Sequence, residues 1–557
     1  MKSRLFLIIL LLYGYSIFFS HKTMSYAKEI RNPDFAYTGL LRPQPSKDIP
    51  RVLNEIQIND LTSTTDLLYQ LQYLPNVQIT SYGNPAYANF VSLNRENPKN
   101  TLFMLNGVPL NSPLNGSFNL NNIGTNNIAK FEIIRSPASS LYGTNAGAGA
   151  INLLSKEYGK TISLSTEYQT PNSLFYKIGH HSNIGNLSSN LESSLFTNTI
   201  DSSNLNGDFN ITLSESTDME LFGYLYSSKG YGLKNEGGTA VLSTNFSWDD
   251  TYFLSIIPYT LIESGINQQD YHTSRIGTQI KYDIDLGGLI SFSTGADLHE
   301  DKAKGSTFNE QKAMVQSIFS GTTINYLGFF VITLYLRYDH HSIAGGTFNP
   351  GTNILYRLSD ELALRASINS GTAMPNLAEL KVNSNLPIEK IWEATTGFDY
   401  SFSEKTNLRT TCFYNEARNA TTTDSNFLIR PEEISSIDTI DLITKFGIEL
   451  ELSIELFKSL TSYYNYSYIS LEKNLTNLFN IGFIFLTPLN QTIDFKIQYY
   501  DLNKKFDIAG KLSQKITSEI DIYFLTKNLN YYTLPISNNT FELNEYRTYN
   551  TGLSLKF

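Results

Sequence analysis

Few residues in this sequence combine the types and spacing that catalysis or metal binding requires. Two adjacent histidine pairs, His180-His181 and His340-His341, offer imidazoles that can bind a metal ion, although such pairs in a β-hairpin are more often polar turn residues. A hydrolase would need a serine–histidine or aspartate–histidine arrangement, and the seven histidines form no such motif. We therefore predict no enzyme, no catalytic nucleophile and no resident metal or cofactor.

A glycine-rich stretch offers a second candidate chemistry, phosphate binding. It reads KFEIIRSPASSLYGTNAGAGAINLLSK and contains Gly143, Gly147 and Gly149. A phosphate-binding loop would lead from its glycines into a helix that carries Lys-Ser or Lys-Thr. Here the glycines lead into an apolar strand, AINLLSK. We therefore predict that they permit close backbone packing and that the stretch binds no nucleotide.

The first 27 residues have the form of a secretory signal peptide. Lys2 and Arg4 precede the apolar run LFLIILLLYGYSIFF, and Ser25-Tyr26-Ala27 supplies a cleavage site; retention of the run as a membrane anchor is the alternative. Cleavage removes three of the 42 basic residues and none of the 52 acidic ones, so the mature charge is −13. This charge argues against a nucleic-acid partner. The single cysteine, Cys412, excludes an intramolecular disulfide.

From about residue 160 onward, apolar and polar residues alternate along the chain. In KFGIELELSIEL, Phe446, Ile448 and Leu450 fall on one face, whereas Glu449 and Glu451 fall on the other. A soluble β-sandwich alternates in the same way. However, many of these strands approach the ~9–11 residues that a tilted strand needs to cross a bilayer, and their ends carry Tyr and Phe. The final residues, YNTGLSLKF, also alternate up to a terminal aromatic.

The length of this region indicates the size of the sheet. The roughly 398 residues from 160 to 557 leave room for about 22 strands at roughly 18 residues per strand and turn. We therefore predict a transmembrane antiparallel β-barrel of 22 strands, with 18 or 20 strands and longer loops as alternatives. No segment after the signal peptide is apolar for the ~18 residues of a membrane helix.

Residues 28–158 have a different pattern. STTDLLYQLQYLPNV predicts a helix that is capped by Thr64 or Thr65 and ended by Pro75. Short strands follow, and we predict them at residues 77–80, 102–105, 131–134 and 151–154. These elements form a small α/β domain. Because so wide a barrel would otherwise have an open lumen, we predict that this domain fills it.

Several motifs resemble those of the TonB-dependent outer-membrane receptors. The glycine-rich stretch is similar to the end of the family's plug domain. LLYQLQYLPNVQIT resembles its helix and turn, and TLFMLNGVPLN resembles its hairpin. SGTAMPNLAEL and NSNLPIEKIWEATTG resemble two barrel motifs. The positions that we match to the plug's structural residues are Asn106, Gly107, Arg135, Tyr142, Gly143 and Gly147. The hairpin aspartate of the family is replaced here by Asn106, and the glycine of its Arg-Gly-Pro by Ser136.

The resemblance implies an organisation and a function. We expect a signal peptide at 1–27, a TonB-box and tether segment at 28–50, a plug domain at 51–158 and an outer-membrane barrel at 159–557. Such receptors take up a scarce nutrient at the surface of Gram-negative-type bacteria, here cobalamin or a ferric siderophore. A passive porin is the alternative, but it would lack the plug. We expect a monomer in outer-membrane lipid.

The resemblance also implies a partner, TonB of the TonB–ExbB–ExbD complex. DFAYTG stands where the TonB box belongs, and its residues are Asp34, Phe35, Ala36, Tyr37, Thr38 and Gly39. An ordinary linker is the alternative. The box would add a strand to a sheet edge of TonB, so that main-chain hydrogen bonds transmit force.

In the family, ligand lies on two plug loops, which implies candidate binding residues here. We expect a small metal-chelate ligand to contact Tyr82, Asn84, Tyr87, Asn115 and Phe118. Short loops favour cobalamin over a larger siderophore. Heme is disfavoured because heme receptors carry a histidine in this region, whereas PNLAELKV, between Met374 and Asn383, contains none. The resemblance to the cobalamin receptors also makes Asp249-Asp250 a candidate calcium site in an outer loop.

Overall fold

The computed structural model describes most of the chain between residues 35 and 556. The described residues are 35–36, 44–45, 49–50, 53–57, 64–82, 88–124, 128–156, 161–169, 173–184, 186–197, 200–214, 216–230, 233–248, 251–266, 270–306, 308–403, 405–422, 428, 436–471, 474–501, 505–517, 519–527 and 548–556. The signal-peptide prediction lies outside them. Within these ranges, no helix has the length and apolar character needed to cross a membrane.

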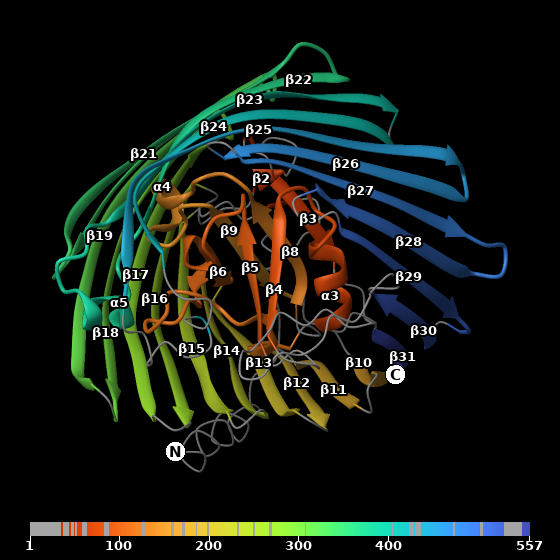
Figure 1. The fold of residues 1–557 in the computed structure, drawn as a ribbon, viewed down its shortest axis with the longest axis horizontal. Helices are drawn as coiled ribbons and strands as arrows, with labels where there is room; N and C mark the ends of the chain where they lie inside the picture. Colours follow the sequence, from red (N-terminus) through yellow and green to blue (C-terminus); the bar gives the residue numbers. More distant parts are fainter. Residues whose placement is uncertain are drawn as a thin grey trace.

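The larger part of the structure is a closed antiparallel barrel of 22 strands, β10 to β31 (Figure 1). The last strand pairs with the first, with Leu555 opposite Leu164. This confirms the predicted fold class. The strands are β10 (Thr161–Gln169), β11 (Ser173–Ile184), β12 (Leu187–Thr197), β13 (Ile200–Ser214), β14 (Thr217–Gly230), β15 (Leu233–Trp248), β16 (Tyr252–Ile266), β17 (Tyr271–Leu286), β18 (Ile290–Gly305), β19 (Phe308–Tyr326), β20 (Phe330–His341), β21 (Gly345–Arg357), β22 (Leu362–Ala373), β23 (Glu389–Ser403), β24 (Thr406–Thr422), β25 (Asp438–Phe457), β26 (Leu460–Leu471), β27 (Asn474–Leu486), β28 (Gln491–Tyr500), β29 (Lys505–Lys515), β30 (Ile520–Lys527) and β31 (Thr548–Lys556).

The two faces of the barrel wall have opposite polarity, as the alternation predicted. On β25, the apolar side chains of Phe446 and Leu450 are exposed on the outer face. The intervening Lys445 and Glu449 are buried on the lumen side. An apolar exterior matches hydrocarbon, and the closed sheet leaves no unpaired strand edge in the bilayer.

The N-terminal domain lies within the ring of strands (Figure 1). Its main sheet has the order β3-β8-β9-β6-β7, in which β6 and β9 are parallel, and β4 and β5 form a second sheet. Its apolar core includes Phe103, Phe131 and Leu153. The elements are β3 (Leu53–Gln57), α3 (Thr64–Leu71), β4 (Val77–Tyr82), β5 (Ala88–Leu93), the 3₁₀ helices Pro98–Asn100 and Leu120–Asn122, β6 (Thr101–Leu105), β7 (Val108–Pro109), β8 (Ile128–Ile134), α4 (Ser139–Tyr142) and β9 (Gly149–Ser155).

The glycines of the opening stretch lie where backbone or side chains approach closely. Gly143 ends α4 with a φ of 93°, and a Cβ there would meet the Arg337 guanidinium at 2.7 Å. Gly149 has a φ of 136°, and a Cβ would lie 2.0 Å from the carbonyl oxygen of Ile134. Neither position has room for a side chain without a shift of its neighbours.

Replacing Gly149 by alanine is expected to destabilise the plug by about 1–3 kcal/mol, because the new Cβ meets a fixed backbone carbonyl in a strained conformation. The matched control is Gly147→Ala, whose Cβ would meet the movable end of Ile391 at 2.8 Å. We expect the control to cost less. Urea midpoints for plug unfolding, followed by proteolysis, compare the two variants. Equal midpoints would contradict the argument.

Several elements, among them β3, β5 and α4, were not predicted from the sequence. Strand β5 is buried along its whole length, so it carries no period-two signal. In the short strand β3, Leu53 and Ile56 are buried and Asn54 and Glu55 between them are half-buried, an order that does not alternate. A short helix, α5 (Leu377–Val382), lies between β22 and β23, where we expected only turns. Asn376 caps it by accepting a hydrogen bond from the Glu379 backbone, and the Glu379 side chain accepts one from Asn376 in return.

The two ends of the barrel differ in the length of their connections. Residues 374–388, 423–437 and 528–547 join strands at one end, whereas short turns such as 287–289 and 327–329 join them at the other. Outer-membrane barrels have longer loops outside the cell. The long connections therefore mark the outer end.

Candidate ligand-binding site

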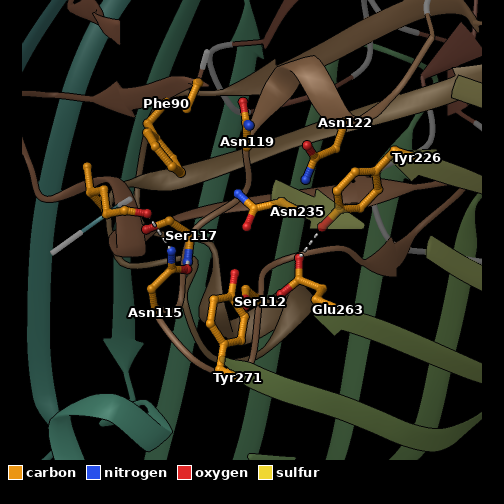
Figure 2. A pocket seen from close by; sticks show the side chains of 12 residues that line it. Phe90, Ser112, Asn115, Ser117, Asn119, Asn122, Tyr226, Asn235, Glu263 and Tyr271 are labelled. Carbon is orange, nitrogen blue, oxygen red and sulfur yellow. Dashed lines mark hydrogen bonds between the residues drawn. The ribbon is translucent and has the colours of Figure 1, made fainter. Parts of the chain in front are cut away.

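A small cavity lies between the outer end of the plug and the barrel wall (Figure 2). Its volume is about 40 Å³, which is room for a few water molecules. Leu428, from a long outer connection, lies at its edge. The described residues that line it are Ala88, Phe90, Ser112, Asn115, Ser117, Asn119, Asn122, Tyr226, Asn235, Glu263, Tyr271 and Leu428.

The plug side of the cavity is built on the hairpin between β6 and β7. Asn106 and Gly107 turn the chain with φ values of 47° and 82°, and the amide of Gly107 donates to Asn152 Oδ1 at 2.9 Å. Asn111 then holds the following loop, because its Nδ2 donates to the carbonyls of Thr101 (3.0 Å) and Gly116 (2.8 Å). The loop is therefore fixed at its base before it reaches the cavity.

The cavity wall is rich in neutral polar groups. Asn115 Nδ2 donates to the carbonyl of Leu428 at 2.9 Å, which joins the plug to an outer connection. Asn115 Oδ1 accepts from the backbone amide of Ser117 at 2.9 Å. The Ser117 hydroxyl is buried and has no hydrogen-bond partner within the described residues. Because buried hydroxyls are normally hydrogen-bonded, a water molecule or a ligand can serve as the partner of this one.

The barrel side supplies one carboxylate. Glu263, on β16, accepts hydrogen bonds from the Tyr226 hydroxyl at 3.4 Å and from the Ser112 side chain. Figure 2 shows the Tyr226 and Glu263 side chains meeting at the cavity. Arg275, on the neighbouring strand, does not pair with Glu263. It forms a bidentate ion pair with Asp301, with both N–O distances 2.7 Å.

The predicted binding residues occupy different places. Asn115 lines the cavity. Tyr82 and Phe118 are each 3% exposed; Tyr82 packs edge-on against Phe90, and Phe118 packs against Phe103 at a ring distance of 5.2 Å. Phe118 also meets the Tyr224 ring of the barrel wall edge-on at 6.2 Å. Both side chains are thus buried, and neither lines the cavity. The predictions for Asn84 and Tyr87 lie outside the described residues.

Sequence reasoning missed the barrel residues of this site. Alternation predicts that Tyr226, Asn235, Glu263 and Tyr271 belong to strands, and their parity assigns them to the lumen face. It does not say which of 22 strands stands opposite the plug loop. An acid within the otherwise apolar run YTLIESGI was the available signal for Glu263.

Arg135, matched to the plug motif, joins the plug to the barrel. Its guanidinium forms ion pairs with Glu449 and Glu451 on β25, and its Nε donates to Asn54 Oδ1 at 2.7 Å. Burial alone would lower the pKa of Arg135, but the two carboxylates outweigh it and the pKa lies above its ordinary value. Arg135 therefore remains charged, and its pairing compensates two buried acids.

Lys99 forms a second buried connection, to the outer end of the barrel. Its ammonium lies 2.9 Å from Glu379 on α5 and 3.5 Å from Glu389, and it also donates to Thr421. Burial opposes the charge on Lys99, but the carboxylates outweigh it, so the pKa is raised. Because the backbone amide of Ala378 also donates to the carbonyl of Leu114 at 3.1 Å, α5 and the cavity loop are held together.

The remaining predicted features are only partly described. In the TonB-box segment, Phe35–Ala36 (β1) pairs antiparallel with Gln44–Pro45 (β2); Asp34, Tyr37, Thr38 and Gly39 lie outside the described residues. So does the calcium candidate Asp249-Asp250. Within the described ranges, no group of three or more His, Cys, Asp or Glu residues is placed to hold a metal ion.

Barrel, plug and outer cavity together define a class: an outer-membrane β-barrel whose lumen is filled by an N-terminal domain. The family model "TonB dependent receptor-like, beta-barrel" matches residues 31–557, and the chain belongs to this family. Family membership also assigns the chain to the outer membrane.

Individual relatives share low sequence identity with this chain, over only part of its length. The vitamin B12 transporter BtuB of Vibrio vulnificus (strain YJ016) is 29% identical over 133 residues, 24% of this chain and 21% of that protein. The probable TonB-dependent siderophore receptor PirA of Acinetobacter baumannii is 20% identical over 438 residues, 58% and 57% of the two chains. The chain thus aligns with about a fifth of the first relative's length and just over half of the second's.

Solved structures agree on the fold. The siderophore receptor PirA of Pseudomonas aeruginosa aligns with a TM-score of 0.76 and 15% identity, over 91% of this chain and 99% of that one. A mutant of the ferric enterobactin receptor of the same organism aligns with a TM-score of 0.76 and 14% identity, over 91% and 98%. These similarities define the architecture.

Proposed function

We propose that the protein is an energy-coupled receptor that binds a scarce metal chelate, cobalamin or a ferric siderophore, at the outer end of its plug and imports it. The observation that carries the proposal is the plug itself, joined to the wall by Arg135 and Lys99 and shaping a polar cavity that faces outward. A passive porin conducts solutes through an open lumen, whereas the plug fills the lumen here. The cavity forms the floor of the binding site, because about 40 Å³ cannot enclose a chelate.

We further propose that the segment around Phe35–Ala36 is the TonB box. Phe35 and Ala36 pair antiparallel with Pro45 and Gln44, and this extended conformation of the two residues is the one that strand addition needs. Binding to TonB would exchange this short internal pairing for a longer one with the partner. The exchange costs only a few hydrogen bonds.

The test is uptake of labelled cobalamin and of several ferric siderophores by cells with and without the gene, before and after a protonophore collapses the proton gradient. We expect gene-dependent accumulation of one ligand that stops when the gradient collapses. Gene-dependent uptake that persists without the gradient would instead indicate a passive channel. Loss of cobalamin uptake alone would identify a cobalamin transporter, and loss of iron uptake alone a siderophore receptor.

A further inference from the structure

We infer that the cavity at the plug apex selects a neutral or cationic chelate and discriminates against strongly anionic ones. The inference rests on the proposed uptake function and adds the charge class of the ligand. It is drawn from the side chains that line the cavity and from the charged groups next to them.

The lining offers no positive charge. Among its described residues, Glu263 is the only one with an acidic side chain, and neither lysine nor arginine is present. Arg275 lies nearby on β17, but Asp301 holds it in a bidentate pair and its Nη1 donates to the carbonyl of Asn111 at 3.3 Å. Its charge is therefore compensated, and an anionic ligand would find no free cation here.

Neutral hydrogen-bonding groups are available instead. Ser117 is 2% exposed, and its hydroxyl has no hydrogen-bond partner among the described residues. The side-chain amides of Asn122 and Asn235 line the cavity, and neither makes a side-chain hydrogen bond within the described part of the chain. An amide offers both donors and an acceptor, so these groups suit the carbonyl, hydroxyl and amide groups of a neutral ligand.

The Glu263 carboxylate favours a ligand that carries a hydrogen-bond donor. This carboxylate has about four acceptor positions, of which the Tyr226 and Ser112 side chains use two. No lysine or arginine lies within ion-pair distance of it in the described ranges. A ligand ammonium or hydroxyl can therefore bind the remaining positions, whereas a ligand anion would be repelled in this partly desolvated site.

The test measures binding to the purified full-length receptor in detergent by equilibrium dialysis. The probes are cyanocobalamin and ferrichrome (neutral), ferrioxamine B (cationic) and ferric enterobactin (strongly anionic). We expect a neutral or cationic probe to bind at least tenfold more tightly than ferric enterobactin.

The Glu263→Gln variant should weaken the binding of ferrioxamine B about tenfold relative to the binding of the neutral probes, since it removes a charged hydrogen-bond acceptor. Glu236→Gln is the matched control, because that acid pairs with Lys234 on the exposed outer surface, and it should change nothing.

Two results would overturn the inference: ferric enterobactin binding as tightly as the other probes, or equal effects of Glu263→Gln and Glu236→Gln on ferrioxamine B. Energy-dependent import of ferric enterobactin by cells would then leave the proposed function intact and remove only the charge assignment. If energised cells import none of the four probes in a gene-dependent manner, the proposed function itself fails.

Discussion

Deletion of residues 34–39 is expected to abolish uptake while leaving ligand binding at the cell surface unchanged. Its described residues, Phe35 and Ala36, are not part of the plug sheet. We therefore expect the deletion to leave the cavity and the ion pairs of Arg135 and Lys99 in place. It would remove the strand through which TonB transmits force. Accumulation of labelled ligand at 37 °C, compared with surface binding to de-energised cells, separates the two steps. Unchanged uptake would show that the segment is an ordinary linker.

A pair of point variants tests whether the backbone carries the interaction. Tyr37→Pro removes a main-chain donor and restricts φ, so strand addition should fail and uptake should fall at least tenfold. Tyr37→Phe keeps the backbone and an aromatic ring, and uptake should stay near the wild-type level. If both variants lose uptake equally, the tyrosine hydroxyl rather than the strand would be the recognised feature.

Arg135→Ala is expected to lower the stability of the plug within the barrel by about 3–5 kcal/mol, because it leaves buried Glu449 and Glu451 without their cation. With a urea slope of about 1–3 kcal/mol per molar, the urea midpoint of plug unfolding should fall by about 1–5 M. Conductance of the receptor in planar bilayers during a urea titration reports the midpoint, because plug unfolding opens the lumen.

Two further variants make this result specific to burial. Lys405→Ala removes an ion pair with Glu455 whose N–O distance is 2.9 Å, but the lysine side chain is 63% exposed. We expect this variant to lower the free energy of unfolding by at most about 0.5 kcal/mol. Replacing Glu449 and Glu451 by glutamine in the Arg135→Ala background should restore part of the loss, since no uncompensated charge then remains. An Arg135→Ala midpoint no lower than that of Lys405→Ala would refute the argument.

The features of the fold that could be predicted are those that depend on local sequence pattern. Alternation assigned lumen and lipid faces, and the length of the alternating region gave 22 strands, because a closed barrel repeats one rule strand after strand. The plug helix and four of its strands were also predicted from caps and apolar runs. Strand β5 was missed since both of its faces are buried, and β3 was missed since its buried and half-buried residues do not alternate. Helix α5 was missed since its capping box spans only a few residues.

The binding site depends on the tertiary structure. Asn115 could be named from its loop, but Glu263 and Asn235 come from strands that only barrel closure and plug docking bring to that loop. Phe118, an equally plausible contact from sequence, is buried between Phe103 of the plug and Tyr224 of the barrel wall. By itself, the sequence determined the family, the barrel and the plug, because local pattern and motif spacing encode them. Which side chains meet at the cavity, and hence its acidic and neutral character, was decided by contacts between residues more than 100 positions apart along the chain, which local pattern does not specify.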